Sequence, residues 1–175
     1  MSSRLSSKSL GGFFISIIAL MLIGPISISL FELPFTLQTL VICVTAYYFG
    51  WISVLACVVY VGFGLSGLPV FSGFASNPGI LKTISAGFVI GFPIMAGSIG
   101  GLKNQIKLTY LKVFLLFILA HIILISFAGL YNVVAGLDFP TTTYILKYLT
   151  PSLLIKSGIA GFIIIGTSKF TAKVV

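Results

Sequence analysis

Apolar residues form six long runs along the chain, and short stretches with Gly, Pro or charged residues separate them. This pattern predicts membrane-spanning helices, because a helix crosses the hydrocarbon core of a bilayer with roughly 20 mostly apolar residues. The predicted spans are residues 11–31, 35–49, 52–66, 79–101, 113–130 and 151–167. We therefore expect an all-α integral membrane protein, a bundle of six transmembrane helices with short loops, in one domain over residues 1–175.

The connections between the predicted spans differ in character. Gly50 and Trp51 form the shortest one, since Gly breaks helices and Trp favours the membrane interface. Residues 67–78 are rich in Gly, Ser and Pro and carry no charge, and we interpret them as a re-entrant loop or a lid. The first run follows Arg4 and Lys8 as a secretory signal would, but no cleavage pattern follows it, so we interpret it as an uncleaved span.

Composition supports a membrane protein and excludes several classes of function. Hydrophobic residues make up 58% of the chain and charged residues only 7%, whereas soluble domains average about 25% charged. The spans leave only short loops, so no room remains for an ATP-binding domain or a catalytic head. Cys43 and Cys57 have no metal-binding or redox spacing, and we interpret both as small apolar residues of the core.

The charge balance predicts the orientation in the membrane. Ten Lys and Arg residues face two acidic ones, for a net charge of +8. They stand at the ends of apolar runs, where the positive-inside rule explains them without a nucleic-acid partner. Three lysines crowd the connection after the fourth span, and two close the chain: Lys103, Lys107, Lys112, Lys169 and Lys173. Charge bias and span parity agree on a multi-pass protein of the cell membrane with cytoplasmic N- and C-termini.

The candidates for catalysis are too few and too scattered for an enzyme. His121 stands alone in the fifth span, without a second His or an acid at helical spacing, and we interpret it as a packed histidine. The chain has no glycine-rich phosphate-binding motif. We therefore predict that the protein is not an enzyme, holds no metal or cofactor, and takes any ATP-derived energy from another subunit.

Two lysines are candidates for binding an anion. A charge near the bilayer centre costs about 2.5–3.5 kcal/mol on insertion scales, so such a residue usually faces a cavity or a partner. Lys156, about five residues into the last span, is the strongest candidate for holding a small carboxylate, with snorkelling to the headgroups as the alternative. Lys82, near the start of the fourth span, is the second candidate.

Neutral polar side chains near the predicted outer ends of the spans suit a ligand with an amide-like head. Thr36 and Gln38 lie early in the second span, and Asn77 lies in the uncharged loop. Each offers hydrogen-bond donors or acceptors toward an outer cavity. Glu32 and Asp138, the two acidic residues, stand in loops, and we interpret them as solvated or turn residues.

Three segments together resemble the BioY family, the biotin-specific substrate-binding (S) components of energy-coupling factor (ECF) transporters. The segments are PFTLQTL at residues 34–40, GLPVF at 67–71, and the pairs Gly87-Phe88 and Gly91-Phe92. They occur in the family's order and at similar spacing. The resemblance covers roughly residues 24–93 and continues more weakly over 151–156.

The resemblance implies high-affinity capture of biotin from outside and its uptake across the cytoplasmic membrane. The implied partners are biotin as transported ligand, an ECF coupling transmembrane subunit, two ATPase subunits and the lipid membrane. Lys156 matches a lysine of the family and is expected to pair with the biotin carboxylate, while Lys82 is a secondary cation. The expected contacts of the polar head and the ring are Asn77, Gln38, Thr36, Phe71, Phe74 and Phe88.

The sequence departs from the family at Leu153, because the family usually carries an aspartate three residues before its lysine. A leucine accepts no ureido N–H, so this departure favours an alternative, an S component for another small vitamin-like carboxylate. A third possibility is a ligand-free membrane assembly protein, in which Lys156 only snorkels.

Overall fold

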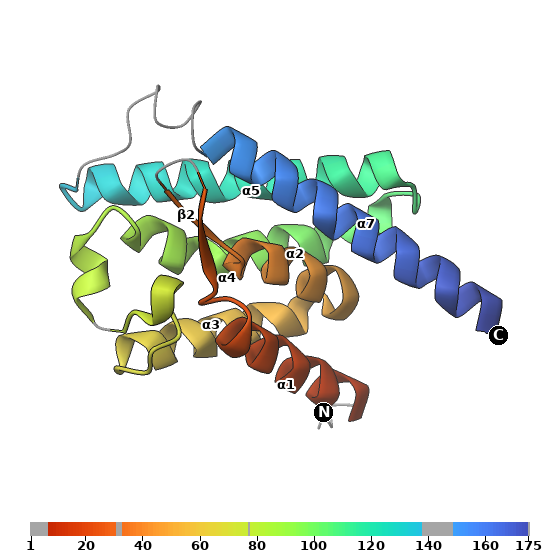
Figure 1. The fold of residues 1–175 in the computed structure, drawn as a ribbon, viewed down its shortest axis with the longest axis horizontal. Helices are drawn as coiled ribbons and strands as arrows, with labels where there is room; N and C mark the ends of the chain where they lie inside the picture. The colour runs from red at the N-terminus through yellow and green to blue at the C-terminus, as the bar shows by residue number, and fades with distance from the viewer. Residues whose placement is uncertain (1–6, 31–32, 77, 138–148, 175) are drawn as a thin grey trace, which may run out of the picture.

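The structure is a computed structural model that describes residues 7–30, 33–76, 78–137 and 149–174. These residues contain six α-helices, which confirms the prediction of a mainly α-helical bundle (Figure 1). Three of them, α4, α5 and α7, are long and apolar enough to cross a membrane, and the other three are shorter but apolar. The helices are α1 Ser7–Leu22, α2 Gln38–Phe49, α3 Trp51–Leu65, α4 Ala86–Leu102, α5 Tyr110–Val134 and α7 Thr150–Val174.

Helix α2 lies at the centre of the bundle and contacts α1, α3, α4 and α7. Helix α4 packs against α3 on one side and α5 on the other, and α7 crosses α5 (Figure 1). The largest fully buried side chains come from all of these layers and include Leu20, Ile42, Tyr60, Met95 and Phe117. Cys43 and Cys57 are fully buried in the same core, as predicted.

Glycines set how closely α4 approaches its neighbours. A Cβ on Gly87 would lie 2.6 Å from the backbone of Ala128, and one on Gly100 would lie 3.1 Å from the backbone of Gly50. Small residues allow such close helix contacts within a membrane. Gly50 itself has a φ of +60°, which allows the tight turn from α2 into α3 that the sequence predicted.

A β-hairpin replaces the predicted end of the first span and the start of the second. Helix α1 ends at Leu22, and strand β1 (Ser27–Leu30) pairs antiparallel with β2 (Leu33–Thr36). The prediction of helix up to residue 31 and from residue 35 was therefore wrong. Gly24-Pro25 ends the helix, and the Ser-Ile-Ser-Leu alternation that follows has the two-residue period of a strand.

The fourth helix begins later than predicted, at Ala86 rather than near residue 79. A 3₁₀ segment, η2 (Pro78–Lys82), precedes it, and the Thr83 hydroxyl donates to the Ile80 carbonyl at 2.8 Å, which favours a turn. Lys82 thus lies in this segment and not inside a spanning helix. The described part of the uncharged loop contains η1 (Ser72–Phe74), and the Gly73 N–H donates to the Pro25 carbonyl at 2.9 Å.

The last two helices are longer than predicted, since α5 begins at Tyr110 rather than residue 113 and α7 runs on to Val174. Lysines at their ends suggested boundaries, yet long basic side chains extend along a helix and remain compatible with it. A short 3₁₀ segment, η3 (Lys103–Gln105), joins α4 toward α5.

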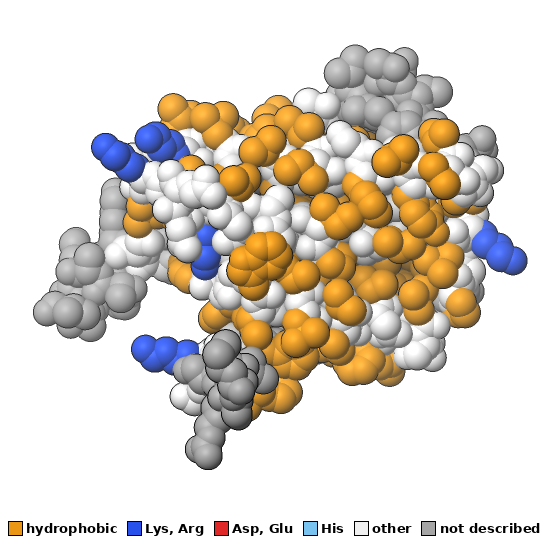
Figure 2. Space-filling model, turned by 180° about the vertical axis from the view of Figure 1, so that it is seen from behind, with side chains coloured by type: hydrophobic (Ala, Val, Ile, Leu, Met, Phe, Trp, Pro, Cys, Tyr) orange, Lys and Arg blue, Asp and Glu red, His pale blue; other side chains and the backbone are white. Residues whose placement is uncertain are grey.

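The surface of the bundle is apolar around its middle. Figure 2 shows hydrophobic side chains across one face, with most of its Lys and Arg side chains gathered at one end. Exposed apolar residues on α5 alone include Leu111, Leu115, Ile122 and Leu130. A soluble monomer rarely exposes so much contiguous apolar surface, so the chain is a multi-pass membrane protein.

Candidate ligand-binding site

The two ends of the bundle differ in what they contain. At the hairpin end, the β-hairpin, residues 67–76 and 78–85, and the first turns of α7 lie together (Figure 1). At the lysine end, Lys103, Lys107 and Lys112 lie on or beside the α4–α5 connection, and α1 begins and α7 ends toward this end (Figure 1). The predicted site residues that the structure describes belong to the hairpin end.

Lys156 lies on α7 and is only 6% exposed. Its Nζ is 4.6 Å from the centre of the Phe35 ring on β2, a cation–π contact. Its helix, α7, packs against α2 and α5. The hairpin and three helices therefore surround the ammonium, a position that does not fit snorkelling.

No carboxylate faces Lys156 within the described residues, because Glu32 and Asp138 lie outside them. An ammonium taken out of water is costly unless an anion and hydrogen bonds compensate it. A buried lysine that faces no carboxylate among the described residues is therefore suited to receive an anionic ligand group.

Two further polar atoms are buried without a hydrogen-bond partner in the described part of the chain, Thr39 Oγ1 and His121 Nε2. The other ring nitrogen of His121, Nδ1, lies 2.8 Å from the Phe117 carbonyl and 3.3 Å from Ser157 Oγ. An Nδ1–H that donates to the Phe117 carbonyl leaves Nε2 as an acceptor. Because buried polar groups are nearly always paired, these two atoms indicate a hydrogen-bonding ligand nearby.

Sequence reasoning missed Thr39 and underestimated His121. His121 is packed in the core, as predicted, with Nδ1 beside Ser157 of α7, but its Nε2 has no hydrogen-bond partner among the described residues. The sequence contained a weak indication that Thr39 is buried. Thr39 precedes Cys43, a predicted core residue, by four positions, so the two lie on the same face of α2.

Gln38 is buried and has a partner within the protein. Its Nε2 donates to the Tyr60 hydroxyl at 2.7 Å, and that hydroxyl donates to the Val70 carbonyl. The chain of hydrogen bonds ties the start of α2 to α3 and to the uncharged loop. Gln38 thus holds the hairpin end together, whatever it contributes to a ligand.

The other predicted residues lie in different environments. Phe71 is buried, packs on Gly64, and meets the Tyr60 ring edge-on with centroids 5.9 Å apart. Phe74 is 58% exposed, Phe88 and Thr36 are half-buried, and Lys82 is exposed. Asn77 lies outside the described residues.

Comparison with known proteins identifies the family. A sequence profile of the BioY family matches residues 1–173. The chain belongs to the BioY family. The resemblance seen in the sequence is thereby confirmed, as is the prediction that the chain is not an enzyme.

Individual BioY relatives support the assignment. A biotin transporter BioY of Thermotoga maritima is 39% identical over 89 residues, which are 50% of this chain and 53% of the relative. A biotin transporter BioY2 of Lactococcus lactis subsp. cremoris is 27% identical over 168 residues, 94% of this chain and 84% of the relative. The S component for biotin from an ECF-type ABC transporter, solved at 2.1 Å, has the same fold, with a TM-score of 0.72 and 20% identity over 97% of this chain and 95% of that one.

Two of the three BioY-like segments of the sequence converge at the hairpin end. PFTLQTL contains β2 residues and the start of α2, and GLPVF follows α3. The hydrogen bonds from Gln38 through Tyr60 to Val70 link the two segments. Residues that looked like separate family motifs thus support one another in space.

Proposed function

We propose that this protein captures biotin at the hairpin end and mediates its uptake across the cytoplasmic membrane. It does so as the S component of an ECF-type transporter, with a coupling transmembrane subunit and ATPase subunits as partners. The single observation that carries the proposal is the buried Lys156 beside Phe35 in a chain of the BioY family. The names of the relatives, biotin transporters, support the choice of ligand.

Lys156 pairs with the ligand carboxylate in this proposal. The ammonium is already desolvated and lacks an anion among the described residues, so a carboxylate gains a charge-assisted hydrogen bond. Phe71, Phe74 and Phe88 enclose the ring, and residues 67–78 act as a lid. Asn77, Gln38 and Thr36 contribute polar contacts, and Lys82 is the secondary cation.

Thr39 and His121 complete the set of hydrogen-bonding groups. Leu153, where the family usually carries an aspartate, is buried and accepts no N–H. The Nε2 of His121 is an acceptor without a partner among the described residues, and it replaces that carboxylate as the partner of a ureido N–H. In the alternative, the ligand has a head group other than the ureido ring of biotin, and the chain is an S component for another small carboxylate.

The lysine end faces the cytoplasm in this proposal, with both termini on that side, because basic residues concentrate on the inner side of the membrane. The hairpin end then opens outward. This orientation places the candidate ligand site where external biotin arrives.

The test is binding of biotin, biotin methyl ester and lipoate to the purified full chain in detergent, measured by calorimetry. Wild type should bind biotin below micromolar concentration, and lipoate, which lacks the ureido ring, much more weakly. Removing one partner of a buried charge pair costs about 2–5 kcal/mol, so the ester should bind at least about 30-fold more weakly.

Lys156→Met should lower the affinity for biotin to that of the wild type for the methyl ester, and it should leave the affinity for the ester unchanged. Lys82→Met serves as the control that separates the two candidate cations. Folded wild type that ignores micromolar biotin but binds lipoate would favour the alternative ligand. Equal affinity of wild type and Lys156→Met for biotin would exclude the role of Lys156.

A further inference from the structure

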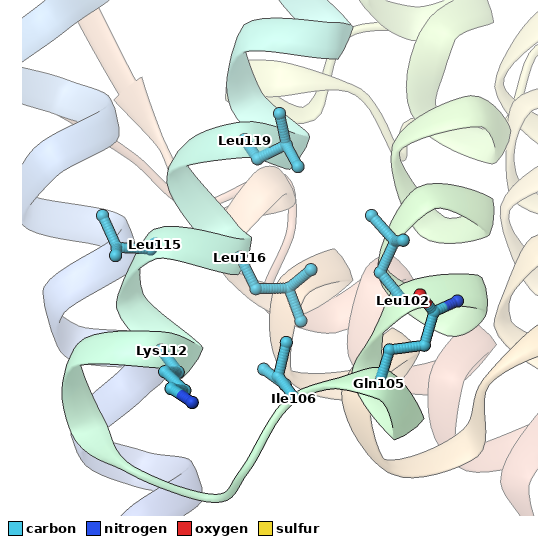
Figure 3. Close-up of a pocket in the computed structure, with 7 residues that line it drawn as sticks. All are labelled: Leu102, Gln105, Ile106, Lys112, Leu115, Leu116 and Leu119. Atoms are coloured by element: carbon cyan, nitrogen blue, oxygen red, sulfur yellow. The ribbon is translucent and has the colours of Figure 1, made fainter.

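A pocket of ≈ 390 Å³ lies at the lysine end, away from the candidate biotin site (Figure 3). This volume falls within the range of about 300–1,000 Å³ typical of small-molecule sites. The end of α4, the α4–α5 connection and the first turns of α5 form its walls. The lining residues are Leu102, Gln105, Ile106, Lys112, Leu115, Leu116 and Leu119.

The pocket changes from polar to apolar along its length. On α5, Lys112, Leu115 and Leu119 are spaced so that they share one face of the helix (Figure 3). Seven residues at 1.5 Å each separate the lysine from the last leucine by about 10 Å along the helix axis. Leu115 and Leu119 are 52% and 44% exposed, so lipid surrounding the bundle has access to the pocket. The lining therefore has the polarity of a phospholipid, a charged head followed by a hydrocarbon chain.

Positive charge at the mouth of the pocket has no counterpart among the described residues. Lys112 lies in the first turn of α5, which contains no acidic residue. The N-terminal end of a helix is positive, so a lysine there is unfavourable unless an anion compensates it. Lys107 adds a further exposed cation, and neither lysine makes an ion pair or hydrogen bond with a described residue. Lys103 differs, since its Nζ donates to the Tyr47 and Tyr48 carbonyls at 2.6 and 3.2 Å.

We propose that this pocket binds an anionic phospholipid. The phosphate lies near Lys112 and the free N–H groups of the first turn of α5, where a helix terminus favours anions. One acyl chain packs along Leu115, Leu116 and Leu119. Charge complementarity selects an anionic headgroup over a zwitterionic one, and the leucines select a lipid over a free phosphate ion.

The experiment is native mass spectrometry of the full chain in detergent micelles, with phosphatidylglycerol or phosphatidylcholine of identical acyl chains. Each lysine near a membrane surface contributes roughly fivefold to anionic-lipid affinity, so we expect at least that preference for phosphatidylglycerol. Lys112→Gln should abolish the preference, whereas Lys8→Gln, an exposed lysine on α1, should keep it. Leu119→Trp should weaken the binding of both lipids several-fold. Leu111→Trp, at an exposed leucine outside the pocket, should leave their binding unchanged.

Four results would overturn the proposal. One is equal retention of the two lipids, and another is indistinguishable behaviour of each variant and its control. The third is displacement of phosphatidylglycerol by millimolar inorganic phosphate, which would assign the mouth of the pocket to a free anion. A dimer that Leu119→Trp dissociates would likewise assign the pocket to a second copy of the chain. Circular dichroism melting confirms that each variant is folded.

Discussion

The two ends of the bundle use lysine in opposite ways. At the hairpin end, Lys156 is buried against Phe35 and faces no carboxylate among the described residues. At the lysine end, Lys107 and Lys112 are exposed, and Lys103 is satisfied by carbonyl groups at the end of α2. The difference teaches that burial separates the two kinds of lysine: exposed lysines at helix ends remain solvated, whereas a buried ammonium that faces no carboxylate among the described residues is the expected place for a ligand anion.

The backbone also differs between the two ends: it is more regular at the lysine end than at the hairpin end. The lysine end connects its helices with the tight turn at Gly50 and with one short 3₁₀ segment, η3. The hairpin end contains a β-hairpin, two 3₁₀ segments and positive φ angles at Gly67, Gly73 and Phe74. Irregular backbone at membrane depth is tolerated where it is buried in protein or lines a cavity. Such backbone is therefore expected where a membrane protein holds its ligand.

The strongest way to break this comparison is to remove the buried charge. Lys156→Met should raise the free energy of unfolding of the ligand-free protein by about 1–4 kcal/mol, because it relieves the desolvation of a buried ammonium that faces no carboxylate among the described residues. Lys82→Met, at an exposed lysine, should leave stability unchanged. Unfolding in mixed detergent and SDS measures both variants. A less stable Lys156→Met would show that Lys156 already has a stabilising partner without ligand.

Packing beneath the uncharged loop offers the next largest effect. A Cβ on Gly64 would lie 2.1 Å from Phe71 Cζ, and Phe71 is buried, so its ring has little room to move. Gly64→Ala should cost about 1–3 kcal/mol of stability and weaken biotin binding through displacement of the loop. Thermal unfolding and calorimetry measure the two effects.

The same helix provides a matched control for that variant. A Cβ on Gly62 meets nothing within 4 Å, so Gly62→Ala should stabilise α3 by up to about 1 kcal/mol through helix propensity. Equal melting temperatures for Gly64→Ala and Gly62→Ala would contradict the packing described for Phe71.

The smallest expected effect sharpens the comparison at the lysine end. Lys103→Gln removes the ammonium that holds the Tyr47 and Tyr48 carbonyls and should cost about 1 kcal/mol, the typical net worth of a hydrogen bond. Lys107→Gln should be neutral in the same thermal melt, because Lys107 is exposed. Biotin affinity should stay constant in both. If Lys103→Gln alters biotin affinity, the two ends are coupled and the comparison fails.

The sequence predicted the α-helical membrane class, the tight turn at Gly50 and the buried cysteines, because apolar runs and helix breakers act through local contacts. It also predicted that lysines gather at one end of the bundle and that the chain resembles the BioY family. Both predictions rest on charges at span ends and on short motifs in order, which are visible in the sequence itself. It did not predict the β-hairpin, although the Ser-Ile alternation after Pro25 was there to read. Apolar strands and apolar helices look alike when hydropathy alone is considered.

Only the tertiary structure decided which polar groups meet. The rotation of each helix about its axis determines whether Lys156 reaches the surface or the core, and nearly all-round apolar helices give little sign of that rotation. The links from Gln38 to Tyr60, and from His121 to Ser157, span 22 and 36 residues of sequence. Such contacts depend on how α2, α3, α5 and α7 pack together, and packing is a property of the whole bundle rather than of any one segment.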